Sequence, residues 1–152
     1  MQNTIKIKGT VEIKQIRNGE VIKSFKGENI ITNAGKAQIA LLAGDATAVP
    51  FTYLAVGTGS TAAAVTDTTL VTEITDTGLA RAAATVSRTT TTVTNDTLSL
   101  SYTWTATGAK TIAEVGMFNA SSSGTMLGRK LTSAITTANT DQIVMTYTVA
   151  FA

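Results

Sequence analysis

The sequence predicts an all-β fold, a β-sandwich or jelly-roll-like domain of about eight to ten strands with an N-terminal β-hairpin and one short helix. The 152-residue chain contains 31 threonines and one proline, and β-branched residues favour pleated surfaces over helices. Apolar and polar residues alternate with a period of two in several segments, as in strands that bury one face. Clusters of Gly, Asn, Asp and Ser separate these segments, as turns do.

A chain of this length can bury a core large enough to fold without cross-links. Cysteine and histidine are both absent, which excludes a disulfide framework, a thiolate metal site and acid–base catalysis by imidazole. Hydrophobic residues make up 43% of the chain and charged residues 14%, a balance unlike that of a disordered tail. We therefore expect a single β domain over residues 1–152.

The N-terminal segment, residues 1–31, is predicted to form a hairpin. TVEIKQI and EVIKSF flank Asn18-Gly19, and Asn-Gly is the strongest short-range hairpin signal because both residues accept positive φ. A helix is predicted next, within residues 32–44. Thr32 or Asn33 can cap its N-terminus and Gly44 its C-terminus, so the helical residues are expected at about 33–43.

Residues 51–152 are predicted to form the main part of the β-sandwich. FTYLAVG is expected to be a buried strand, and two runs on either side of residues 94–96 are expected to pair. KTIAEVGMFNA and TMLGRKL flank a Ser-Ser-Ser-Gly turn at residues 121–124, which predicts another hairpin. Apolar residues alternate from Ile143 to Phe151, so the last residues are expected to be a core strand. Trp104 lies in a similar alternating run, and we expect it in the core.

Residues 57–62, Gly-Thr-Gly-Ser-Thr-Ala, match the spacing of a dinucleotide-binding loop. That loop works only where it opens a helix, whose N-terminal amides hold the pyrophosphate. The following segment, VTDTTLVTEITDTGLA, is rich in β-branched residues and Asp and does not predict a helix. We therefore expect a strand that ends in a tight loop of small residues, and no cofactor.

Catalysis would have to depend on carboxylates, lysines or hydroxyls. Asp67 with Glu73, or Glu73 with Asp76, could form a glycosidase-like pair, but acids in a Thr-rich connection are typical of solvated turns. No imidazole base and no calcium-binding loop motif accompany the hydroxyl and carboxylate residues. We expect no catalytic residue, no metal site and no enzymatic activity, with a polysaccharide depolymerase as the distant alternative.

Positive charge is concentrated at the N-terminal end. Residues 1–36 hold seven Lys or Arg against three Glu, within a net charge of +2. Nucleic-acid binding is not expected, because acidic residues interrupt the basic ones and aromatic residues, at 5%, are too few to stack bases. We expect this segment to dock on an acidic protein surface. The candidate partner-binding residues are Lys6, Lys8, Lys14, Arg17, Lys23 and Lys26.

No signal peptide or membrane span is predicted, since MQNTIKIKGT lacks an apolar core and no apolar run is long enough to cross a bilayer. We therefore expect a protein made in the cytosol, with no membrane partner.

Several fragments of the sequence resemble a family of small structural proteins of tailed bacteriophages, which includes capsid-decorating, neck and tail-fibre-associated subunits. The fragments are TNAG, AVGTG, DTTL, EVGMFNA and GTMLGR, and the resemblance covers roughly residues 29–131. It implies a virion component that forms a homo-oligomer, most often a trimer.

From the resemblance we expect a capsid decoration or cement protein, which binds the major capsid protein on the outside of the shell and stabilises the assembled lattice by mass action. The alternative is a tail- or neck-associated subunit or a receptor-binding module, whose exposed loops recognise a host surface.

Overall fold

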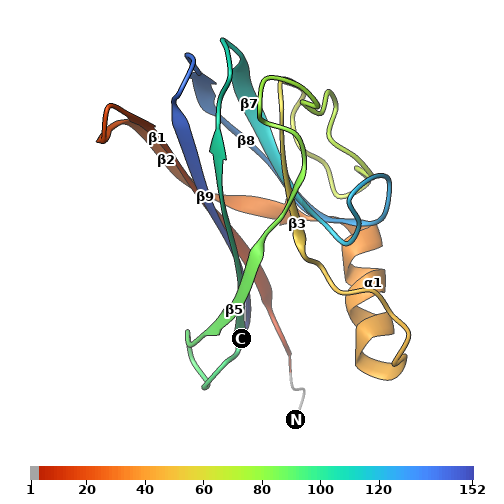
Figure 1. Ribbon diagram of the computed structural model, residues 1–152. Helices are drawn as coiled ribbons and strands as arrows, with labels where there is room; N and C mark the ends of the chain where they lie inside the picture. The colour runs from red at the N-terminus through yellow and green to blue at the C-terminus, as the bar shows by residue number, and fades with distance from the viewer. Residues whose placement is uncertain (1–3) are drawn as a thin grey trace.

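The computed structural model describes residues 4–152, and within them it has nine antiparallel strands and one helix (Figure 1). The predicted all-β class is confirmed, together with the N-terminal hairpin and the short helix. The elements are β1 (Ile7–Arg17), β2 (Glu20–Ile31), α1 (Asn33–Gly44), β3 (Tyr53–Gly57), β4 (Ala82–Ala83), β5 (Thr85–Thr89), β6 (Thr97–Thr105), β7 (Thr111–Phe118), β8 (Met126–Thr136) and β9 (Gln142–Phe151).

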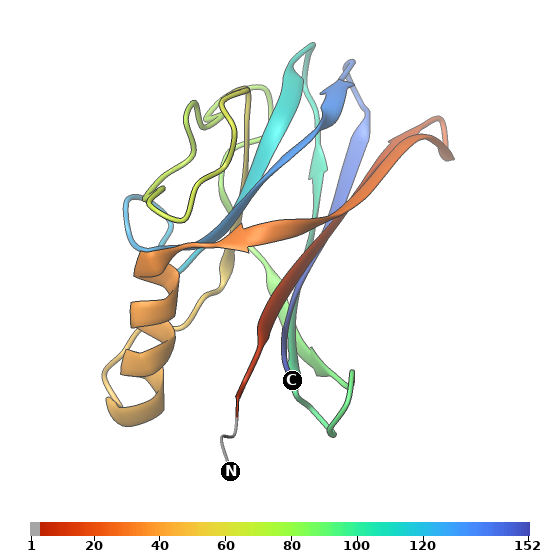
Figure 2. The same cartoon turned by 180° about the vertical axis from the view of Figure 1, so that it is seen from behind.

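The strands form one curved sheet in the order β4-β3-β7-β8-β2-β1-β9-β6-β5. β2 joins the two halves of the sheet, because it pairs with β1 along most of its length and with β8 at Ile30 and Ile31. The two end strands, β4 and β5, are separated in the chain only by Ala84, whose N–H donates to the carbonyl of Thr52. The chain therefore passes from one end of the sheet to the other and nearly closes a barrel (Figures 1 and 2).

One hydrophobic core lies between the two halves of the sheet. Leu54 and Val115 come from one half, Leu100 and Tyr147 come from the other, and all four are fully buried. Trp104 is also buried, as predicted, and its Nε1 donates to the carbonyl of Ala80 at 2.7 Å. A buried indole N–H normally finds such a partner, so this bond fixes the ring against the segment before β4.

β9 is central, since it pairs with β1 along one edge and with β6 along the other. Its apolar side chains from Ile143 to Val149 point into the core at alternate positions, which confirms the predicted core strand. The hairpin turn between β1 and β2 has positive φ at Asn18 (52°) and Gly19 (81°), as an Asn-Gly turn requires. The hairpin predicted at residues 121–124 is confirmed by the pairing of β7 with β8.

Helix α1 begins after the N-cap Thr32, whose side chain accepts a hydrogen bond from the N–H of Gly35 at 2.9 Å. The prediction that Gly44 caps the C-terminus was wrong, because Gly44 is the last helical residue and Asp45 is the cap. The Asp45 carboxylate accepts bonds from the N–H and hydroxyl of Thr47, and this turn ends the helix in place of a left-handed glycine. Within residues 4–152, no helix is both long and apolar enough to cross a membrane.

Candidate partner-binding site

Three of the six predicted partner-binding residues lie on the outer face of the hairpin. Lys8 and Lys14 occupy alternate positions on β1, and Lys26 on β2 lies opposite Glu12 in the register. Lys8 forms an ion pair with Glu28 at 2.6 Å, and Lys14 forms one with Glu12 at 3.0 Å. Positive and negative side chains therefore alternate on this face, and the adjoining surface of β9 contributes threonines. Its role in binding a partner remains a prediction.

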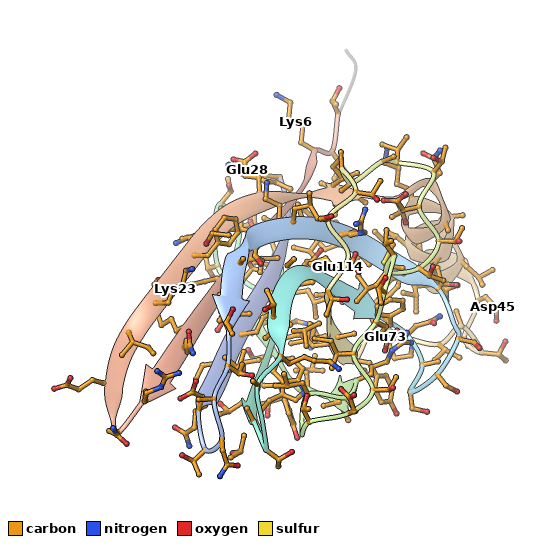
Figure 3. The ribbon with its side chains drawn as sticks, turned by 90° about the horizontal axis from the view of Figure 1, so that it is seen from above. Lys6, Lys23, Glu28, Asp45, Glu73 and Glu114 are labelled. Atoms are coloured by element: carbon orange, nitrogen blue, oxygen red, sulfur yellow. The ribbon has the colours of Figure 1, made fainter. Side chains whose placement is uncertain are left out.

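The other three residues lie elsewhere. The Arg17 guanidinium turns toward the start of β9 and donates two bonds of 2.8 Å to Asp141, the residue before that strand. Lys23 donates to the carbonyl of Ala134 at the end of β8, so these two residues tie the hairpin to its neighbouring strands. Lys6 lies far from Lys23 (Figure 3). The backbone of Lys6 pairs with that of Ala152. The six residues are thus distributed over two faces and both ends of the hairpin.

The Asp141 carboxylate is fully buried, and Gln15 and the N–H of Ala138 also donate to it, each at 2.7 Å. Its pKa lies well below the ordinary value, because the hydrogen bond from Arg17 outweighs the opposing effect of burial and the other two donors add to it. The hairpin is therefore anchored by a group that must stay ionised.

We expect Asp141→Asn to reduce the acid sensitivity of the protein. A depressed pKa in the folded state contributes stability above the unfolded pKa of about 3.9, and this contribution is lost as the pH falls toward the folded value. The wild type should therefore be more stable than Asp141→Asn at pH near 7 and lose more unfolding free energy between about pH 5 and pH 2. Urea unfolding across this range measures the difference, and parallel pH profiles would contradict the assignment.

The Gly-Thr-Gly loop at the end of β3 contacts a carboxylate of the same chain, that of Glu114. Glu114 lies on β7, where the loop crosses the sheet (Figure 3). Its carboxylate accepts hydrogen bonds from the N–H groups of Gly59 at 3.1 Å, Val71 at 3.1 Å and Thr72 at 2.8 Å. A Cβ atom at Gly57 or Gly59 would lie 2.5 Å from Glu114 Oε1. The glycines are therefore explained by a close internal contact with Glu114.

Arg129 on β8 completes an ionic cluster, which we define as Asp67, Glu114 and Arg129. Glu114 and Arg129 are fully buried, and the Asp67 side chain is 24% exposed. Arg129 is fully buried and donates to Glu114 at 2.7 Å, to Asp67 at 2.9 Å and to the carbonyl of Thr61 at 2.8 Å. Burial raises the pKa of Asp67, but the N–H of Ala64 and the Arg129 guanidinium together hold it below its ordinary value. The cluster fastens the start of the long connection between β3 and β4 to the sheet.

The carboxylates considered for catalysis each have a separate cation. Besides the Asp67 contact with Arg129, Glu73 pairs with Arg81 at 2.6 Å and Asp76 pairs with Lys110 at 2.9 Å. Arg81 also lies over the Phe118 ring, 3.6 Å from its centroid. The three acids therefore serve as anchors along the connection between β3 and β4. Over residues 4–152, no group of three or more acids forms a potential metal site.

Sequence reasoning did not assign roles to Glu114, Arg129 or Asp141. A signal for two of them was present, because the fragments AVGTG, DTTL, EVGMFNA and GTMLGR contain Gly59, Asp67, Glu114 and Arg129. The structure brings these four residues together in one contact network. The fragments that carry the family resemblance therefore coincide with the cluster that fixes the loop.

An apolar groove, which sequence reasoning also missed, lies between α1 and the end strand β5. Its volume is about 410 Å³, and Arg88 is the one charged residue in its lining. The other lining side chains come from α1, the segment before β3, and strands β5, β6, β8 and β9, and they include Ile39, Leu42, Phe51, Val86, Leu127 and Phe151. A groove of this composition is typical of a surface that binds another protein.

Comparison with protein-family models finds a match to the family described as "Podophage GP4 fiber I protein gp80" over residues 29–149. The matched region contains the whole ionic cluster and all the residues that line the apolar groove except Phe151. No curated protein and no solved structure matches the chain significantly.

Proposed function

Since the chain belongs to the podophage fiber I protein family, and is thus a structural protein of the bacteriophage virion, we propose that it is a subunit of a tail-associated fiber. The match over residues 29–149 carries this proposal, because it spans the sheet from the end of β2 through most of β9. The family description names a fiber and not an enzyme, which supports a role without chemistry.

The structure suits a mechanical role. The connection between β3 and β4 contains little regular structure. It is held at successive points by the ionic cluster and by two further ion pairs, Glu73 with Arg81 and Asp76 with Lys110. A loop anchored in this way keeps one conformation, and a fixed surface loses little conformational entropy when it binds. We infer that this connection presents a preformed contact surface within the virion.

Capsid decoration, the first expectation from the sequence, makes a different prediction about abundance. A decoration protein covers the capsid lattice and approaches the copy number of the major capsid protein, whereas a fiber subunit is present at a small fraction of that number. Quantitative mass spectrometry of purified virions, with isotope-labelled peptides of both proteins, measures the ratio. A low ratio supports the fiber proposal, and a ratio near that of the capsid lattice would replace it with decoration.

A second measurement locates the protein on the particle. Gold-labelled antibodies raised against the purified chain should bind at the tail in electron micrographs of intact virions. Labelling spread over the capsid surface would contradict the fiber proposal, independently of the copy number.

A further inference from the structure

The tip of the β1–β2 hairpin projects from the barrel (Figures 1 and 2). Two apolar side chains are exposed there. Val21 is 55% exposed and Ile22 is 48% exposed. They lie at the start of β2, directly after Glu20. Adjacent exposed apolar residues on a projecting hairpin are typical of a surface that binds a protein.

Glu20 is unusual among the acidic residues. All ten acidic residues lie within residues 4–152. Nine of them, all except Glu20, either form an ion pair or accept hydrogen bonds from other groups of the chain. Within residues 4–152, the Glu20 side chain forms neither an ion pair nor a hydrogen bond. The hairpin tip therefore combines two exposed apolar side chains with one carboxylate that has no partner within residues 4–152.

The apolar groove has the complementary composition. Three of the four arginines, Arg17, Arg81 and Arg129, pair with carboxylates. The fourth, Arg88, has no carboxylate partner among the described residues, and it lies in a lining that is otherwise mainly apolar. A guanidinium in such a lining favours an occupant that carries a carboxylate beside apolar groups.

We propose that the hairpin tip of one copy of this chain docks in the apolar groove of the next copy. Val21 and Ile22 enter the groove, and Glu20 pairs with Arg88. The hairpin tip lies at the opposite end of the molecule from α1 and β5 (Figures 1 and 2), which contribute to the groove lining, so one copy cannot fill its own groove in this way. Such a contact joins two different surfaces and leaves a free tip and a free groove on every pair, so copies can add head to tail.

Charge reversal tests the contact, with sedimentation of the purified full chain over a range of concentrations as the measurement. The wild type should show a mass that rises with concentration. Glu20→Arg and Arg88→Glu should each weaken self-association about tenfold or more, because each places like charges together at the contact. A chain that carries both substitutions should associate again. Glu28→Lys, a charge reversal at an exposed residue of the same strand as Glu20 but away from the hairpin tip, should have no effect.

Mixing gives a more specific result. An equimolar mixture of Glu20→Arg chains and Arg88→Glu chains should associate although each variant alone does not, because every tip then meets a groove of opposite charge. Ile22→Asp should abolish association without loss of folding, since the side chain is exposed in the monomer. Circular dichroism of each variant checks the fold.

Three results would overturn the proposal: a wild-type chain that stays monomeric up to about 1 mM, association that neither reversal weakens, and a closed trimer of fixed mass that is insensitive to Glu20 and Arg88. These readouts use the isolated protein and do not depend on its position in the virion. A fiber location can therefore hold or fail separately from the head-to-tail contact.

Discussion

Removal of residues 143–152 will abolish cooperative folding. β9 pairs with β1 through ten residue positions and with β6 through nine, so its loss separates the hairpin from β6 and β5. It also removes Ile143, Met145, Tyr147 and Val149, all fully buried, from the core. The loss of even one large buried side chain costs about 2–5 kcal/mol, and whole domains are stable by only about 5–15 kcal/mol.

Near-UV circular dichroism and urea unfolding of the truncated chain measure this effect. The matched control is removal of Ala152 alone, which leaves β9 complete and takes away only the backbone bonds with Lys6. The control should unfold cooperatively near the wild-type midpoint. A truncated chain with native aromatic signals and a cooperative transition would show that β9 is not needed for the fold.

Substitution of Glu114 by alanine should lower the free energy of unfolding by about 3–5 kcal/mol, because it leaves Arg129 as a buried charge without its main partner. Both side chains are fully buried, and their contact is 2.7 Å long. The change also leaves the N–H groups of Gly59, Val71 and Thr72 without an acceptor, which adds to the loss. Chemical denaturation monitored by Trp104 fluorescence gives the value.

The exposed pair Lys8–Glu28 provides the control. Its side chains are 62% and 68% exposed, so Glu28→Ala should change stability by less than about 1 kcal/mol. Many buried ion pairs can be replaced by apolar residues without loss of stability. The double variant Glu114→Gln with Arg129→Met should nevertheless be less stable than the wild type, because the amides and carbonyls of the loop still lose hydrogen-bond partners. A loss for Glu114→Ala no larger than that for Glu28→Ala would contradict the role of the cluster.

The sequence predicts those parts of the fold that depend on neighbouring residues. Asn18-Gly19 locates the first hairpin because positive φ is a local requirement, and the alternation from Ile143 to Phe151 identifies a core strand because the side-chain period of a strand is local. The helix follows from the cap at Thr32. Its C-terminus was placed one residue early, since Asp45 competes with Gly44 through its own turn.

The parts that could not be predicted depend on contacts between distant residues. Asp67 and Arg129 are 62 positions apart, and Gly59 and Glu114 are 55 apart, so neither local spacing nor composition reveals that they meet. The same holds for the apolar groove, whose lining runs from Ile39 to Phe151. The six basic residues were grouped by proximity in the sequence, but strand alternation and the ends of the hairpin separate them.

The pairing of β1 with β9 also has a consequence for biosynthesis. The hairpin leaves the ribosome well before β9, the strand that covers one of its edges, because β9 is the last of the nine described strands in chain order. Long-range strand pairing of this kind is slow. Until β9 pairs with β1, the edge of β1 is exposed and can contact other chains. We expect the lysines along the hairpin to act as gatekeepers against aggregation during this interval, which ends when β9 pairs with β1.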